Sequence, residues 1–284
     1  MPTENELTIA TYNILFGINR EQIIENIEQM AKDGVTVFCL QEVINVTDKA
    51  FILDAILQRL GKHWQAAYHV GPEIGKLSIG TAILWNTTVL NLKSEDKIEL
   101  PKIKKFDLHE RLYYQVIGVS GVPLQRKAIC CDFTFNKTPI RITCVHLDNV
   151  GGPRHRYKQF SYLVSSLIAK PKIDHEIIAG DFNTFDLLRT GYEKKLLQRN
   201  LGDEFIDASK QVGWTSDIYN IDFTTSIRLF KWLIKNFNIH VRRRLDYIWV
   251  KNFVVKTCYK LSIPGSDHFP VIAKLRISKS PPKQ

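Results

Sequence analysis

The sequence predicts an α/β or α+β fold in which two packed β-sheets are accompanied by helices. Apolar runs of strand length alternate with segments of helical periodicity along the whole 284-residue chain, and no linker or internal repeat divides it. A hydrophobic content of 44% and a charged content of 24% exclude a disordered, collagen-like or coiled-coil protein. We therefore expect one domain over residues 1–278, followed by a disordered tail over residues 279–284.

Each element is predicted by its own local pattern. The run Leu7–Ile14 is rich in β-branched residues and predicts a strand, whereas a helical stripe of apolar residues predicts a helix over Arg20–Lys32 that ends near Gly34. The apolar run Val35–Leu40 predicts the next strand, and a helix is expected over Asp48–Leu60. The later helices are expected over Arg154–Ile168 and Tyr192–Arg199. The later strands are expected over Thr81–Trp85, Tyr113–Val119, Lys127–Thr134, Ile140–His146, Glu176–Ala179, Leu245–Val250, Val254–Lys260 and Val271–Ile277.

The charge balance and the cysteines indicate partners and compartment. The formal net charge of +10 favours polyanionic partners such as nucleic acid, an anionic membrane surface or a phosphorylated small molecule, although a merely basic surface has the same charge. Five cysteines in apolar runs without zinc-ligand spacing predict buried free thiols in a reducing compartment. Because no signal-peptide pattern and no long apolar run is present, we expect a cytoplasmic protein. No feature predicts a stable protein partner.

Polar residues stand at the ends of the predicted strands at one point after another. They are Asn13, Glu42, His146, Asp181, Asn183, Asp246, Asp267 and His268. A single residue of this kind is usually a cap or a turn former. Their repetition indicates that strand ends converge at one edge of the sheets, where carboxylates and carboxamides form an oxygen-rich site suited to Mg²⁺ or Mn²⁺.

These polar residues lie in six short blocks, which are TYNI (11–14), LQEV (40–43), VHLD (145–148), GDFNT (180–184), RRLDYIWV (243–250) and GSDHFPV (265–271). In this order the blocks resemble the endonuclease/exonuclease/phosphatase superfamily, which has the DNase I-like fold, and they span nearly the whole chain. The resemblance implies a four-layer sandwich of two mixed β-sheets flanked by helices, with the active site at one end. It also implies hydrolysis of phosphate esters by means of a divalent cation and an activated water.

The resemblance assigns roles to individual residues. In the family pattern Glu42 is the principal metal ligand, Asn13 supports it, and Asp267 lies beside the metal and the phosphate. His268 is the general base or orients the attacking water, and Asp246 holds its other ring nitrogen.

Asp181 and Asn183 flank Phe182, so both side chains point toward the phosphorus if this run is extended. Asp181 then accepts a hydrogen bond from the nucleophilic water, and Asn183 donates to a phosphate oxygen. His146 stands where the apurinic-endonuclease branch has a Tyr-x-Pro-Asn block, which argues against abasic-site cleavage. It resembles instead the DNase I, sphingomyelinase and tyrosyl-DNA phosphodiesterase type of site, where the histidine binds a phosphate oxygen or protonates the leaving group. A histidine that only forms a hydrogen bond at the strand end is the alternative.

Several arginines are candidates for substrate binding. Arg154 and Arg156 open a predicted helix, where they either meet a phosphate or form a solvated basic helix start. Arg243 and Arg244 end the segment 227–244, which has six Lys or Arg residues and no acidic residue. Three interpretations of this segment stay open: a nucleic-acid surface, an interfacial helix at an anionic membrane, or a core-packing helix. Its apolar face consists of Ile227, Phe230, Ile234 and Phe237.

The sequence therefore predicts divalent-metal-dependent hydrolysis of phosphodiester bonds, foremost in nucleic acid, by an endonuclease, an exonuclease or a DNA-end phosphodiesterase. The alternative is a lipid phosphodiesterase or a phosphoinositide phosphatase. A catalytically inactive member that only binds nucleic acid or a partner is disfavoured. Such proteins typically lose the metal glutamate or the catalytic histidine, whereas Glu42, Asp246 and His268 are all present here.

Overall fold

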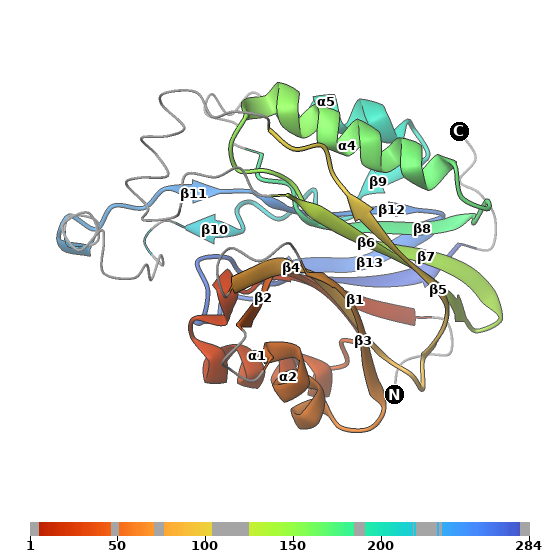
Figure 1. Ribbon diagram of the computed structural model, residues 1–284, viewed down its shortest axis with the longest axis horizontal. Coiled ribbons are helices and arrows are strands. Elements are labelled where there is room, and N and C mark those ends of the chain that lie inside the picture. The colour runs from red at the N-terminus through yellow and green to blue at the C-terminus, as the bar shows by residue number, and fades with distance from the viewer. Residues whose placement is uncertain are drawn as a thin grey trace.

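The computed structural model describes residues 6–46, 51–70, 77–103, 125–184, 191–217, 219, 232 and 235–278. Two six-stranded sheets pack face to face (Figure 1). The first sheet contains, in spatial order, β13 (Phe253–Lys260), β14 (Val271–Ile277), β1 (Glu6–Asn13), β2 (Val37–Val46), β4 (Leu77–Asn86) and β3 (Trp64–Val70). The second contains β5 (Leu90–Glu99), β6 (Lys127–Phe135), β7 (Thr138–His146), β8 (His175–Asp181), β12 (Asp246–Lys251) and β9 (Phe205–Asp207). A separate two-stranded ribbon consists of β10 (Ser216–Asp217) and β11 (Arg242–Arg243).

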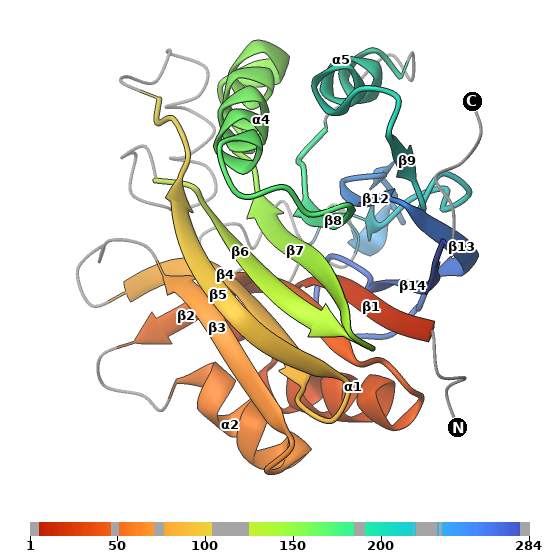
Figure 2. The same cartoon turned by 90° about the vertical axis from the view of Figure 1, so that its right-hand side faces the viewer.

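Of the described helices, two cover the outer face of each sheet, which gives four layers (Figures 1 and 2). α1 (Arg20–Lys32) and α2 (Ile52–Leu60) lie on the first sheet, and α4 (Gly152–Ile168) and α5 (Tyr192–Leu201) lie on the second. A 3₁₀ turn, η1 (Leu15–Gly17), follows β1. The predicted fold, two mixed sheets flanked by helices, is confirmed. No helix in the described ranges has the length and apolar character needed to cross a membrane.

Strand alternation divides the apolar residues among three cores, because successive side chains point to opposite faces of a sheet. Along β2, Val37 and Cys39 face the core between the two sheets, whereas Phe38 and Leu40 face α1 and α2. The third core lies between the second sheet and α4 and α5, where Phe160 packs edge-on against Phe182. Four of the five cysteines are buried as free thiols, as predicted, and the fifth, Cys258, is half-buried.

Most predicted elements are present within a few residues of their expected ends. The helix Arg20–Lys32 has the predicted bounds, and the expected helix over Asp48–Leu60 begins later, at Ile52. The predicted strand Tyr113–Val119 and the tail 279–284 lie outside the described residues. The sequence reasoning missed β3, β5 and the short strands β9, β10 and β11. β5 is an edge strand in which five consecutive residues, 93–97, are exposed. It therefore lacks the apolar run that predicts the other strands.

Each sheet contains one parallel pair, and these pairs determine where the site forms. β1 and β2 are parallel and are joined through α1, whereas β7 and β8 are parallel and are joined through α4. The carboxyl ends of parallel strands meet at the same edge of a sheet, which is where open α/β sheets place their ligand sites. β12 is antiparallel to β8 and begins opposite the end of β8, so its first residue joins the same edge.

Candidate active site

One row of polar residues crosses the end of the second sheet. His146 ends β7 and is in register with Asp181 at the end of β8, and Asp181 is in register with Asp246 at the start of β12. The first sheet adds Asn13 from the end of β1, whose Nδ2 donates a hydrogen bond of 3.0 Å to Asp181 Oδ2. All four side chains are buried. The structure therefore brings together residues that are up to 233 positions apart in sequence number, namely 13 and 246.

A glycine lets the strands of this row approach each other. A Cβ atom on Gly180 would lie 1.9 Å from the carbonyl oxygen of Val145 on β7, and Gly180 has a φ of +157°. Any larger residue would push β8 away from β7 and separate His146 from Asp181. The glycine of the GDFN block thus has a steric role in holding the row together.

A β-bulge directs Glu42 to the same place. Gln41 pairs with Thr81 and Val43 pairs with Gly80, so Glu42 is the extra residue between them, with a left-handed φ of +57°. Because one residue is inserted, Val43 returns to the apolar layer under α1 and α2 instead of pointing into the site. Glu42 Oε1 consequently lies 3.9 Å from Nε2 of His146 across the gap between the sheets.

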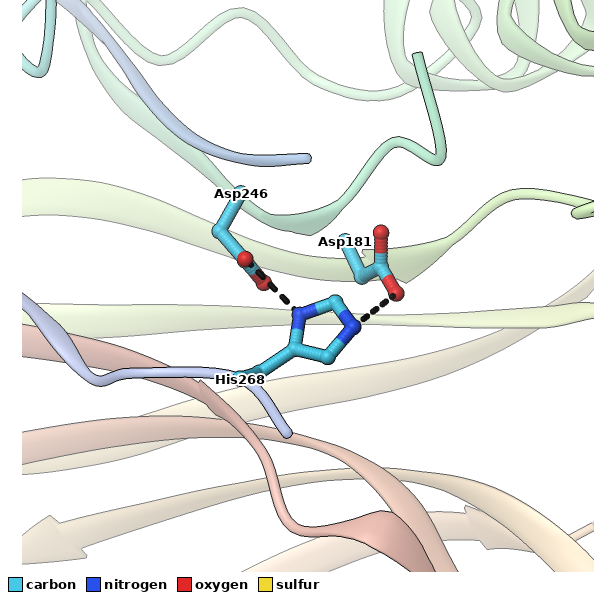
Figure 3. Close-up of side chains that lie close together, drawn as sticks. All are labelled: Asp181, Asp246 and His268. Carbon is cyan, nitrogen blue, oxygen red and sulfur yellow. Dashed lines mark hydrogen bonds and ion pairs between the residues drawn. The ribbon is translucent and has the colours of Figure 1, made fainter. Parts of the chain in front are cut away.

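His268 and Asp246 form a buried hydrogen-bonded pair (Figure 3). Nδ1 of His268 lies 2.9 Å from Asp246 Oδ2, and Nε2 points toward Asp181 Oδ2 at 3.8 Å. One nitrogen or oxygen from each of these three residues lies within 4.8 Å of the others, a spacing that also suits a metal ion. The short hydrogen bond already occupies His268 Nδ1, however, and supports a histidine–aspartate pair more directly than a metal site.

Neighbouring carboxylates set the charge of His268. Burial alone lowers the pKa of His268, but Asp246 and Asp181 outweigh it and raise this pKa well above its usual value. Burial raises the pKa of Asp181 to about 6, against the opposing effect of the nearby His268. The carboxylates and His268 therefore stabilise one another's charges in the dry interior.

Glu42 and Asp267 form a second acidic pair. Burial first, and then the charge of Asp267, raise the pKa of Glu42 to about 7. Burial likewise raises the pKa of Asp267. Glu42 Oε2 is buried and has no hydrogen-bond partner in the described part of the chain. An unpartnered carboxylate oxygen beside a second carboxylate is what a hard divalent cation would satisfy, so the residues present fit such an ion.

Asn183 is close to the site, but the expected extended conformation of GDFN is wrong. β8 ends at Asp181, and Asn183 has a left-handed φ of +49°. Its backbone N–H donates to Asp181 Oδ1 at 2.9 Å, an Asx-type turn, and its Nδ2 donates to the carbonyl oxygen of Leu147 at 3.0 Å. Asn183 and Asp181 therefore do not lie on one face of a strand, although the turn keeps both at the same edge.

His146 has a basic neighbour that the sequence reasoning missed. Nη1 of Arg126 lies 3.3 Å from Nδ1 of His146, and its Nε donates to Asp148 at 3.2 Å. Burial, and then the charges of Arg126 and His268, lower the pKa of His146 well below its usual value. Arg126 immediately precedes β6 and stands in no recognised block, so only the pairing of β6 with β7 places it here.

Thr215 is a second missed residue, and it joins the two segments that contain Asp246 and His268. Its Oγ1 accepts hydrogen bonds from the backbone N–H groups of Leu245 and Asp246, at 3.0 and 3.1 Å. Its carbonyl oxygen accepts the N–H of Phe269 at 2.7 Å, directly after His268. Thr215 therefore holds the backbone of Asp246 beside that of His268. A signal in the sequence is weak, because a lone threonine after Trp214 matches many turns.

The four arginines predicted to bind substrate lie in three different surroundings. Arg154 is exposed on the first turn of α4, whereas Arg156 is buried and donates to Glu193 of α5 and to the carbonyl oxygen of Asp148. The structure thus places Arg156 between helices rather than at the cluster. Arg243 and Arg244 line a cavity beside the site. Of the apolar face predicted for the segment 227–244, only Phe237 is described, and its side chain is exposed.

Comparison with known proteins agrees with this architecture. The model of the Endonuclease/Exonuclease/phosphatase family matches residues 10–268. Among solved structures, the chain resembles an endonuclease/exonuclease/phosphatase family protein from Leptotrichia buccalis C-1013-b, with a TM-score of 0.69, 16% identity, and coverage of 95% of this chain and 100% of that one. It also resembles D. rerio TDP2 complexed with a single-strand DNA product, with a TM-score of 0.66, 17% identity, and coverage of 95% and 99%.

A third similar structure is the human Nocturnin catalytic domain with bound sulfate, with a TM-score of 0.63, 17% identity, and coverage of 98% of this chain and 97% of that one. No curated protein sequence matches the chain. Identities at this level support the shared fold, while the family match extends over all six sequence blocks up to His268. The chain belongs to the endonuclease/exonuclease/phosphatase family.

Proposed function

We propose that this protein is a divalent-metal-dependent phosphodiesterase that acts on nucleic acid, with Mg²⁺ or Mn²⁺ as its cofactor. The observation that carries the proposal is the convergence of four buried side chains, Asp181, Asp246, His146 and His268, with the half-buried Glu42 at one edge of the two sheets. Family membership supports hydrolysis of phosphodiester bonds. The net charge of +10, together with the similarity to a TDP2 structure that contains a single-strand DNA product, supports nucleic acid as the substrate.

The metal position that fits best is at Glu42. Its unpartnered Oε2 and the adjacent Asp267 would hold the ion, and Asn13 would contribute its carbonyl oxygen, which already accepts the N–H of Leu15 at 3.0 Å and has a second lone pair. When bound, a divalent cation supplies positive charge that neutralises the phosphoryl oxygens in the transition state.

The protein's own groups prepare the water and the phosphate. Asp246 fixes His268 through Nδ1, so that Nε2 of His268 and Oδ2 of Asp181 face the same position. A water molecule there donates to Asp181 and is oriented for in-line attack, with the proton passing to the Asp181–His268 pair. Asn183 stabilises this arrangement by donating its backbone N–H to Asp181 Oδ1. On the other side of Asp181, His146 and Arg126 offer donors to the phosphate and to the leaving oxygen.

A substrate panel tests the proposal directly. Single-stranded DNA, duplex DNA, RNA, 5′-tyrosyl DNA, sphingomyelin and inositol phosphates are each assayed with Mg²⁺ and with EDTA. We expect cleavage of a nucleic-acid substrate that stops in EDTA and returns with Mg²⁺. Preferential turnover of sphingomyelin or inositol phosphates would replace nucleic acid by a lipid headgroup, and undiminished turnover in EDTA after dialysis would refute the metal dependence.

A further inference from the structure

A basic pocket lies beside the catalytic cluster. It is a cavity of about 680 Å³, and we define it by six of its lining residues: Lys194, Trp214, His240, Arg242, Arg243 and Arg244. Among the described residues that line the cavity, none is acidic. A cavity of this size that is walled by cations favours an anionic ligand over a neutral one.

Two carboxylates behind the wall hold the cations in place. Buried Asp207 accepts hydrogen bonds from Nη2 of Arg244 at 2.7 and 2.8 Å and lies 2.7 Å from Nζ of Lys194. Buried Asp217 accepts from Nε of Arg242 at 3.2 Å and lies 2.7 Å from Nδ1 of His240. Among the described residues, these two carboxylates face the permanent charges of Lys194 and three arginines, so the cations of the described pocket wall outnumber its carboxylates.

Aromatic rings fix the direction of two of the arginines. The guanidinium carbon of Arg242 lies 4.7 Å from the centre of the Trp214 ring, and that of Arg244 lies 4.4 Å from the centre of the Tyr247 ring. A guanidinium group over an aromatic ring still presents the N–H groups at its edge, and those that do not donate to Asp217 or Asp207 match the geometry of a phosphate. Preorganised donors of this kind lose little entropy when an anion binds.

The pocket continues the row of catalytic residues across the second sheet. In that sheet β7, β8, β12 and β9 are neighbours. β7 ends at His146, β8 ends at Asp181, and β12 begins at Asp246. Thr184, just past Asn183, and Arg244, just before β12, both line the pocket. Since neighbouring strands lie about 5 Å apart, the pocket begins roughly one strand beyond the position between Asp181 and His268. Successive phosphates of one nucleotide chain are separated by a comparable distance.

We infer that the basic pocket binds a second phosphate of the substrate, adjacent to the one that is hydrolysed, and thereby selects single-stranded nucleic acid over compounds with one phosphate. The inference rests on the proposed function and adds the direction of binding: the strand runs from His146 across Asp181 toward β12. Phe237, in the chain that leads into β11, adds an exposed ring, and Tyr219, just after β10, stacks on His240. Aromatic faces suit nucleobases, whereas an inositol headgroup has no π-face to stack.

Matched dinucleotides test the second phosphate. The wild type and the double variant Arg242→Gln/Arg243→Gln are assayed on d(TpT), d(pTpT), d(TpTp), inositol 1,4-bisphosphate and bis(p-nitrophenyl) phosphate. Lys256→Gln, on the exposed edge of β13, is the control for lost positive charge. We expect one of the two phosphorylated dinucleotides to exceed d(TpT) in kcat/KM by roughly tenfold, as one charge-assisted hydrogen bond allows. That gain should disappear in the double variant and persist in Lys256→Gln.

The outcomes separate this inference from the proposed function. If d(TpT) is cleaved but a terminal phosphate gives no gain, or the gain survives in the double variant, the pocket assignment is overturned while the proposed function stands. A higher kcat/KM for inositol 1,4-bisphosphate than for either phosphorylated dinucleotide overturns the choice of nucleic acid. If no substrate is cleaved, calorimetric titration with inorganic phosphate decides: weaker binding by the double variant than by Lys256→Gln supports the anion site, and equal binding refutes it.

Discussion

The surroundings of His146 and His268 differ, although both histidines lie at the same edge of the sandwich and both are buried. His268 faces Asp246 and Asp181, which raise its pKa well above its usual value in spite of burial. His146 lies against Arg126, and burial together with this charge lowers its pKa well below its usual value. Two copies of one side chain therefore take opposite charge states within one site, because neighbouring charges rather than burial decide between them.

This difference divides the site into two functional halves. The half around His268 is rich in carboxylates and is suited to water, protons and a cation. The half around His146 and Arg126 offers donors to an incoming phosphate, and an anion placed there would itself favour protonation of His146. The row from His146 to Asp246 thus contains a gradient from basic to acidic groups across three strands.

The largest expected effect comes from removing the histidine of the acidic half. We expect His268→Ala to lower kcat by on the order of 10²-fold or more, because in the proposed mechanism this residue orients the water. His63→Ala, at an exposed position, is the control. Since Asp246 acts through His268, the Asp246→Asn/His268→Ala double variant should lose little beyond the worse single variant. Losses that multiply in this double-mutant cycle would contradict the pairing.

Glu42 should control metal affinity. We expect Glu42→Gln to raise the Mg²⁺ concentration needed for half-maximal activity by on the order of tenfold or more, because one ligand charge is lost. The free energy of unfolding without metal should not fall, since Glu42 has an unpartnered buried oxygen in the structure. Metal titrations of activity and thermal melts provide the two measurements, with Glu21→Gln on the exposed face of α1 as the control. An unchanged Mg²⁺ requirement would place the ion elsewhere.

Arg126 should contribute to the low pKa of His146, the histidine of the basic half. Replacing it by Gln removes a positive charge next to the His146 ring, so the pKa of His146 should rise toward its usual value of 6.5. NMR titration of the ring protons measures this change, and Arg59→Gln, in a surface ion pair with Glu28, should leave the pKa of His146 where it was. A pKa of His146 that does not respond to Arg126→Gln would leave burial and the charge of His268 as its causes.

The smallest expected effect is on the pH dependence of stability, where the two histidines act with opposite signs. The folded-state pKa of His146 lies below 6.5, so its contribution to stability is lost as pH falls below the unfolded-state value. That of His268 lies above 6.5, so its contribution is present below 6.5 and is lost as pH rises through the folded-state pKa. Urea unfolding measures the free energy of unfolding of His146→Gln and His268→Gln at several pH values. Relative to wild type, this free energy should rise for His146→Gln and fall for His268→Gln as the pH drops below 6.5. Parallel shifts would contradict the assignment.

The strand-end residues could be predicted from the sequence because each follows an apolar run that is recognisable by itself. Asn13, His146 and Asp181 stand at the ends of regular strands, and helix α1 has the bounds that its apolar stripe predicts. Conformation at irregular positions could not be predicted, as Asn183 shows, because its left-handed turn depends on hydrogen bonds to Asp181 and Leu147.

Contacts between distant segments account for the rest of what sequence reasoning missed. The bulge that turns Glu42 into the site depends on how β2 pairs with β4, and the place of Arg126 depends on how β6 pairs with β7. The buried pair of Arg156 and Glu193 joins two helices and has no local sequence signal. Nothing in the residues next to these positions specifies their partners.

The hydrogen bonds of Thr215 have a consequence for how this protein can diversify. They attach the base of the ribbon β10–β11 to the backbone of Asp246 and Phe269. Thr215 precedes the ribbon, so these hydrogen bonds lie outside the stretch between Asp217 and Arg242. None of these hydrogen bonds involves a described residue between Asp217 and Arg242, so we expect the described residues of that stretch to tolerate replacement while Asp246 stays beside His268. Because Thr215 holds Asp246 beside His268, we expect replacement of the loop to change the substrate range while the pair is kept.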